Sequence, residues 1–155
     1  MTRLDVGFTG TRHGMNSIQH DVLSGIIRHS DIKTLHHGDC VGADSQFHNM
    51  RLHFQCVCIH PPSNNALRAF HETQLESNSP NCHCHVMPEL EYAKRNQVIV
   101  DHSDALIATP SDSHPSFGTK MTIGIAMHDG VPVYRIDPEG SVQVYGEDVL
   151  KFHNG

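Results

Sequence analysis

The chain has 155 residues, of which 37% are hydrophobic and 18% charged, so we expect one globular domain over residues 1–155 rather than a disordered tail. A formal charge of −6, with no basic run longer than Lys94-Arg95, argues against a partner that is an extended nucleic acid. No apolar run is long enough to span a bilayer and residues 1–5 show no signal-peptide pattern, so we expect a cytoplasmic protein with no membrane partner.

The predicted elements of the first part of the chain alternate between strand and helix. Residues 3–8 predict a first strand, and a helix follows with its cap at Asn16 or Ser17. A short strand over 33–37 precedes a second helix, and residues 56–59 predict a buried third strand. The second helix has an apolar stripe at helical spacing, made of Ala43, Phe47, Met50 and Phe54.

The alternation continues after a less readable stretch. Residues 63–88 indicate little beyond a short helix near 64–71 and loop chemistry after it. The pattern then predicts a helix from about Glu89 to about His102, a strand over 104–109, a helix from Gly118-Thr119 to a glycine cap at Gly130, and a strand over 131–136. Residues 141–152 are compatible with an edge strand or a terminal helix. The whole predicts an α/β, Rossmann-like parallel sheet of about five strands with helices on both faces.

In such a sheet, ligands bind beyond the carboxyl ends of the strands, so the loops there are the candidate site. Gly10, Thr11 and Arg12 follow the first strand, and they offer close backbone approach, a hydroxyl and a planar cation. An ordinary glycine turn explains this loop about equally well. In the loop after the second strand, Gly38 and Gly42 precede the second helix and leave its first amides exposed to an anion. The carboxylates of Asp39 and Asp44 in the same segment suit a ribose hydroxyl or helix capping.

Two later segments add to this edge. Arg95 and Asn96 lie in the segment 92–96, which by itself is also typical of a solvated helical face. Ser116, Gly118 and Thr119 close the loop after the fourth strand, where free amides, a hydroxyl and the helix dipole favour a phosphate. A capped helix with nothing bound is the alternative at that position.

These segments, together with 59–62 and 104–110, resemble in sequence and order the SLOG superfamily, which includes the Lonely guy phosphoribohydrolases, the DNA-processing protein A domain and molybdenum-cofactor carriers. The resemblance covers residues 6 to about 136. It implies a Rossmann-like fold, and small single-domain bacterial or phage members are the nearest in pattern. Because the superfamily contains both enzymes and binders, the reaction does not follow from it.

The resemblance also suggests roles for single residues. Gly118 and Thr119 match the Gly-Thr pair that holds the phosphate in the Lonely guy enzymes, and Arg95 matches an arginine of that site. The catalytic glutamate of those enzymes falls at position 122, where this chain has Thr122. Threonine cannot replace a carboxylate in general acid–base catalysis near pH 7, so no catalytic residue is assigned. Asp39 or Asp44 replaces it only if the fold brings one of them to the sugar.

We therefore expect a protein that binds a phosphate-bearing nucleotide or a nucleotide-derived ligand, such as an ADP-ribose-type signal, as a sensor, carrier or sequestering protein. The alternative is a hydrolase of the N-glycosidic bond of a nucleoside 5′-monophosphate, and a nucleotide-free assembly subunit is less favoured. No cofactor is expected, and a homo-oligomer is left open.

No metal site is expected either. The run Cys82-His83-Cys84-His85 has zinc's preferred ligand types, but its spacing strains the geometry of a single ion and a second half-site is missing, so an exposed loop with incidental cysteines and histidines is favoured over zinc. The five cysteines are read as reduced thiols, with Cys40 a small packing residue, and His60 either faces the ligand or caps its strand.

Overall fold

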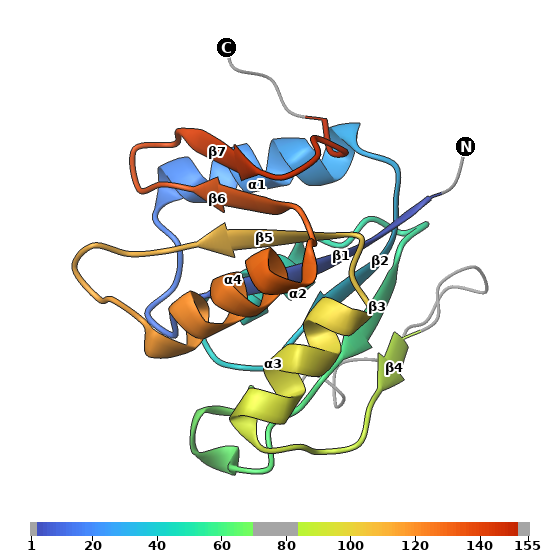
Figure 1. Cartoon of the computed structure of the whole chain (residues 1–155), viewed down its shortest axis with the longest axis vertical. Coiled ribbons are helices and arrows are strands. Elements are labelled where there is room, and N and C mark those ends of the chain that lie inside the picture. The colour runs from blue at the N-terminus through green and yellow to red at the C-terminus, as the bar shows by residue number, and fades with distance from the viewer. Residues whose placement is uncertain (1–2, 70–83, 152–155) are drawn as a thin grey trace.

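The computed structural model, which describes residues 3–69 and 84–151, contains one seven-stranded sheet in the order β4-β3-β2-β1-β5-β6-β7 (Figure 1). Neighbouring strands are parallel except β6 and β7, which pair antiparallel. This architecture confirms the predicted α/β, Rossmann-like fold. The strands are β1 (Leu4–Gly10), β2 (Ile32–His37), β3 (Cys56–Ile59), β4 (Cys84–Val86), β5 (Ala105–Thr109), β6 (Val133–Ile136) and β7 (Val142–Tyr145).

The sheet has more strands than the predicted number of about five, because both of its edges carry a short strand. β4 has three residues and lies in the stretch that is least readable in sequence. β7 has four residues that alternate between partly buried and exposed, with Val142 and Val144 facing the core. An edge strand of three or four residues shows too little periodicity to be identified from sequence with certainty. The structure nevertheless selects the edge-strand alternative within residues 141–152.

Helices cover both faces of the sheet (Figure 1). The larger core cluster lies under α1 and α2 and contains Leu23, Phe47 and the inward side chains of the central strands. A smaller cluster, with Val100 and Ala126, lies under α3 and α4, which are in front of the sheet in Figure 1. The helices are α1 (Ser17–His29), α2 (Ala43–Asn49), α3 (Tyr92–Asp101) and α4 (Phe117–Asp129), with a short 3-10 turn, η1, over Asn65–Leu67.

The ends of the helices follow local sequence signals in two cases and depart from them in one. Asn16 caps α1 through a capping box with Gln19, and Gly130 ends α4 in the left-handed conformation at φ 77°. The second helix is shorter than its apolar stripe predicts, since α2 ends at Asn49 and Phe54 is 43% exposed. The chain must turn back within a few residues to enter β3 at Cys56, and this connection overrides the helical pattern.

Three consecutive residues of β1 show why the strand can lie between two helical layers. Val6 and Phe8 are fully buried in the larger core cluster. Gly7 faces the other layer, where a Cβ atom would overlap Ser103 Oγ and touch Ile99, so the missing side chain lets α3 lie close to the sheet. Among the described helices, none is long and apolar enough to cross a bilayer.

Candidate functional site: a pocket at the carboxyl ends of the strands

A pocket of about 610 Å³ lies at the carboxyl ends of β1, β2 and β5, beside the first turns of α3 and α4. Strand order reverses between β1 and β5, because the chain builds the sheet outward from β1 in both directions. Parallel α/β sheets bind ligands at such a reversal. The volume suits a small-molecule ligand. Ten predicted site residues line it: Gly10, Thr11, Arg12, Gly38, Asp44, Arg95, Asn96, Ser116, Gly118 and Thr119.

The first turn of α4 forms one wall of this pocket. Ser116 caps the helix, and its hydroxyl accepts a hydrogen bond of 3.2 Å from the Thr119 amide. The Thr119 hydroxyl is buried and has no hydrogen-bond partner among the described residues. A Cβ atom on Gly118 would meet nothing closer than Ser116 Oγ at 3.8 Å, so the backbone is open toward a ligand. This wall therefore offers an unpaired hydroxyl and helix N-terminal amides.

Arg95, in the first turns of α3, is a buried cation that also lines the pocket, with 6% of its surface exposed. Its Nη1 donates to the carbonyl oxygens of Gly38, at 2.6 Å, and His60, at 3.1 Å. Its Nε donates to the Asn96 side chain at 2.8 Å, and the guanidinium lies 5.3 Å from the centre of the Tyr92 ring. No described carboxylate pairs with it, so its charge is available to an anion in the pocket.

Two glycines allow the loops of the pocket to approach one another. A Cβ atom on Gly38 would overlap the Arg95 guanidinium. Gly42 has φ 88°, and its Cβ atom would overlap the carbonyl oxygen of Arg12. Gly42 does not line the pocket, contrary to its predicted role as a ligand contact. Its position shows that it shapes the loop that carries Arg12.

The structure also places Asp39 outside the pocket. Asp39 is fully buried, has φ 56°, and its carboxylate pairs with Arg68 Nε at 2.8 Å. Arg68 Nη1 in turn pairs with Glu89 at 2.9 Å. The sequence places Asp39 near a ligand because it follows β2 directly, but Arg68, which is 29 positions away, draws its carboxylate into an ion pair.

Asp44 is the one carboxylate among the described residues that line the pocket. Its Oδ2 accepts a hydrogen bond of 3.1 Å from the Cys40 amide, so it also shapes the loop. Thr122, at the position of the Lonely guy glutamate, lines the pocket as well, and its hydroxyl donates to the Gly118 carbonyl at 2.8 Å. A hydrolase would therefore have to rely on Asp44 for an acid.

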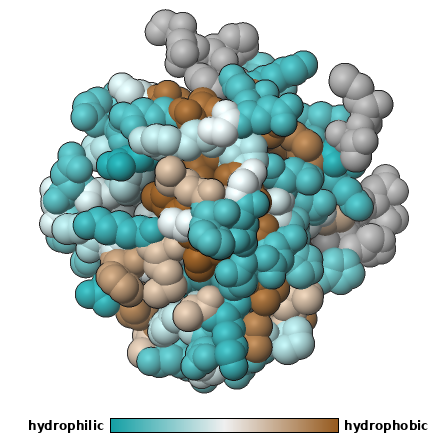
Figure 2. Space-filling view, in the orientation of Figure 1, coloured by the Kyte–Doolittle hydropathy of each residue, from teal (hydrophilic) through white to brown (hydrophobic). Residues whose placement is uncertain are grey.

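Aromatic side chains at the pocket are the functional candidates that the sequence analysis missed. Phe117 is 79% exposed and Tyr92 36% exposed, and both line the pocket. The rings of His13 and His114, which also line it, stack with centroids 3.9 Å apart. In the sequence, Phe117 could have been identified only from its position between the helix cap Ser116 and the predicted phosphate-binding residue Gly118. In the space-filling view, hydrophobic residues on the α3 and α4 face lie between hydrophilic ones (Figure 2).

Cys40 and His60, which the sequence analysis also discussed, are both largely buried, and burial shifts their pKa values. Burial, followed by the nearby Asp44 carboxylate, raises the pKa of Cys40 to about 11, which disfavours a reactive thiolate. His60 is 2% exposed and does not line the pocket. Burial, together with the His36 and His102 rings, lowers the pKa of His60 to about 3. In the segment 82–85, residues 82 and 83 lie outside the described part of the chain.

No family model and no curated protein matches the sequence. Solved structures do match the fold. A molybdenum cofactor binding protein from Rippkaea orientalis has 17% identity and a TM-score of 0.57, over 88% of this chain and 78% of that one. DNA processing protein A from Streptococcus pneumoniae has 16% identity and a TM-score of 0.60, over 86% of this chain and 50% of that one. This chain therefore shares its fold with a molybdenum cofactor binding protein and with a DNA processing protein A, two kinds of protein that the sequence resemblance includes.

A third similar structure corrects one prediction. DNA processing protein A from Helicobacter pylori has 16% identity and a TM-score of 0.60, over 86% of this chain and 65% of that one, and it is described with a single-stranded DNA binding mode. The exclusion of extended nucleic acid was therefore wrong. Net charge alone does not exclude a single-stranded nucleic acid, because such strands are bound by local cationic grooves and aromatic stacking rather than by a uniformly basic surface.

Proposed function

We propose that the pocket binds a phosphate-bearing nucleotide or a nucleotide-derived ligand, and that the protein acts as a sensor, carrier or sequestering protein for it. The observation that carries this proposal is that two polar groups of the pocket lack the partners that a buried hydroxyl and a buried cation normally have. The Thr119 hydroxyl is buried without a partner, and the Arg95 guanidinium is buried without a carboxylate. An anionic ligand group between α4 and Arg95 would satisfy both groups.

The remaining lining residues support a ligand with a ring and a sugar. Phe117 and Tyr92 present exposed aromatic surface on which a base can stack. Asp44 offers a carboxylate oxygen for a ribose hydroxyl. The molybdenum cofactor binding protein among the similar structures supports a small-molecule ligand in this fold. A pocket that held only inorganic phosphate would not need this aromatic surface.

A screen of thermal unfolding tests the ligand class. At a concentration of one hundred times Kd, a ligand that binds only the native state stabilises it by about 2.7 kcal/mol, which raises the melting temperature by roughly 5 to 10 °C. We expect this shift with a nucleoside 5′-monophosphate or with ADP-ribose, and none with the corresponding nucleoside. A single-stranded oligodeoxynucleotide belongs in the screen as a separate arm. If every mononucleotide, dinucleotide and cyclic nucleotide leaves the melting curve unchanged, the proposal fails.

Substitution of Thr119 tests where the phosphate lies. Thr119→Val replaces a buried, unpaired hydroxyl with a methyl group of the same shape, so stability should stay within about 1 kcal/mol of the wild type or increase. Loss of a hydrogen bond to a charged phosphate should weaken binding by roughly 10- to 100-fold. Calorimetric titration measures both the affinity and the stoichiometry. Thr119→Ser, which keeps the hydroxyl, is the matched control, and equal affinities in the Val and Ser variants would place the phosphate elsewhere.

The absence of a glutamate at position 122 predicts the outcome of a turnover assay. The wild-type protein should release no free base from a nucleoside 5′-monophosphate, and Thr122→Glu should introduce slow release by supplying an acid at the pocket wall. Chromatography of the free base measures both. Base release by the wild type that disappears in Asp44→Asn would favour the hydrolase instead.

A further inference from the structure

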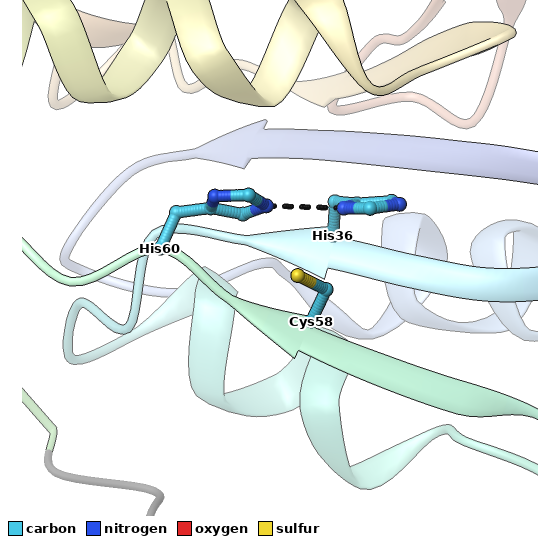
Figure 3. Close-up of side chains that lie close together, drawn as sticks. All are labelled: His36, Cys58 and His60. Carbon is cyan, nitrogen blue, oxygen red and sulfur yellow. Dashed lines mark hydrogen bonds between the residues drawn. The ribbon is translucent and has the colours of Figure 1, made fainter. Parts of the chain in front are cut away.

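Three ligand-type side chains converge under α3, outside the pocket (Figure 3). His36 lies on β2, Cys58 on β3, and His60 directly after β3, and none of the three is more than 6% exposed. One ring nitrogen of each histidine and the Cys58 sulfur all lie within 4.8 Å of one another. In residues 3–69 and 84–151 this is the one group of at least three such side chains with metal-ligand geometry.

The sheet itself brings these residues together. The parallel register of β2 and β3 pairs His36 with Cys58, so their side chains lie next to each other on one face. His60 is two residues beyond Cys58 and returns to the same face. α3 covers this face, where Arg95 donates to the His60 carbonyl at 3.1 Å and the His102 ring lies 5.8 Å from that of His36. The pairing joins residues from two strands, so spacing within either segment could not predict it.

Asp5 fixes the tautomer of His36 in the form that a metal ion requires. Its carboxylate lies 3.0 Å from His36 Nε2, and an ionised carboxylate can only accept, so Nε2 carries the hydrogen. His36 Nδ1 then presents its lone pair to His60 Nε2 at 3.0 Å. A histidine that ligates a metal ion through one ring nitrogen usually donates its other ring N–H to a carboxylate in this way, which holds the ring in place.

The cluster is also incomplete as a purely structural network. His60 Nδ1 is buried and has no hydrogen-bond partner among the described residues. Buried polar networks that serve only stability are normally satisfied at every atom. A thiol and two imidazoles of low exposure, one oriented by a carboxylate, have the donor set of a borderline transition-metal ion.

We propose that His36, Cys58 and His60 bind one Zn²⁺ ion, with solvent in the fourth coordination position. The thiol proton of Cys58 leaves to solvent as the Zn–S bond forms, and the zinc stays in the same oxidation state. Zn–N bonds of about 2.0–2.1 Å and a Zn–S bond of about 2.3 Å place tetrahedral ligand atoms about 3.3 to 3.6 Å apart. The facing nitrogens, at 3.0 Å, need to separate slightly, and the sulfur lies within 4.8 Å of a ring nitrogen of each histidine.

This site departs from the expectation of no metal, and it is separate from the run 82–85. It is also independent of the proposed nucleotide site, although Arg95 contacts both through the His60 carbonyl and the pocket wall. Either proposal can fail while the other stands, because the metal titration uses no nucleotide and the thermal screen adds no metal.

The test uses Co²⁺, which replaces Zn²⁺ and reports thiolate ligation and tetrahedral geometry by absorption. Reduced, metal-free, full-length protein is titrated with Co²⁺, and Zn²⁺ is then added to displace it. We expect one equivalent to bind with a thiolate charge-transfer band. Asp5→Asn removes a group that only orients a ligand, and it should weaken Co²⁺ binding by about 10- to 100-fold. Cys58→Ser removes a ligand itself, so it should weaken Co²⁺ binding by at least about 100-fold.

Matched controls separate this site from the other thiols. Cys56→Ser changes a cysteine on the same strand, two residues away, and should bind Co²⁺ as the wild type does. The double variant Cys82→Ser, Cys84→Ser should also keep the band. If Cys58→Ser does not fold, the wild type is alkylated with and without Zn²⁺ and the modified peptides are identified by mass spectrometry. Bound metal should then protect the Cys58 thiol from alkylation. Loss of the band in the double variant but not in Cys58→Ser, no protection of Cys58, or no Co²⁺ binding would each overturn the proposal.

Discussion

Asp39→Ala should destabilise the protein by about 3 to 5 kcal/mol, although Asp39 does not line the pocket. Its carboxylate is fully buried and pairs with Arg68, whose side chain is 5% exposed. Removal of one partner leaves the other charge buried without full compensation, and that costs far more than the pair contributes net. Thermal and urea unfolding measure the effect, and a fall in melting temperature of roughly 10 °C or more is expected.

Two controls assign the effect of Asp39→Ala to the ion pair. Asp39→Asn keeps a side chain that tolerates φ 56° and removes only the charge, so it separates backbone conformation from electrostatics. Glu89→Ala removes a second ion-pair partner of Arg68, but the Glu89 side chain is 51% exposed and its loss should cost less than about 1 kcal/mol. Equal stability of Asp39→Ala and Glu89→Ala would show that the buried pair has no special role.

Gly42→Ala should destabilise the protein by about 2 to 5 kcal/mol and weaken ligand binding as well. At φ 88° an alanine is strained, and its Cβ atom would overlap the Arg12 carbonyl oxygen, which is backbone and cannot rotate away. The loop 11–13 must shift, and that loop contributes to the pocket wall. Chemical denaturation gives the stability, and titration with the best nucleotide gives the affinity.

Gly124→Ala is the matched control for this substitution. Gly124 lies inside α4, where a Cβ atom would meet nothing within 4 Å, so alanine should stabilise the helix by about 0.5 to 1 kcal/mol. Its ligand affinity should equal that of the wild type. If Gly42→Ala proves as harmless as Gly124→Ala, the close approach of the two loops is not needed for folding or binding.

The regular part of the fold could be predicted because its signals are local. The capping box at Asn16, the left-handed Gly130 and the apolar strand 56–59 each depend on residues close in sequence. The end of α2 and the short strand β4 could not be predicted, since they depend on where the chain must go next. Pairing with β3 defines β4, through the register of Val57 with Cys84.

The candidate site shows the same division. Residues that follow strand ends, such as Thr11 after β1 and Gly38 after β2, reach the pocket because parallel strands bring their carboxyl ends to one edge. Asp39 has an equally suggestive position, but a distant arginine determines where its carboxylate lies. The convergence of His36 with Cys58 depends on strand register, which a single sequence does not reveal.

A crystal structure of the protein with its best nucleotide from the thermal screen is the most direct test of the central claim. We expect a phosphate within hydrogen-bond distance of the Thr119 hydroxyl and the backbone amides of Phe117 or Gly118, with the Arg95 guanidinium also near it. A phosphate bound outside the pocket, or inside it without a contact to the first turn of α4, would show that this helix does not hold the phosphate.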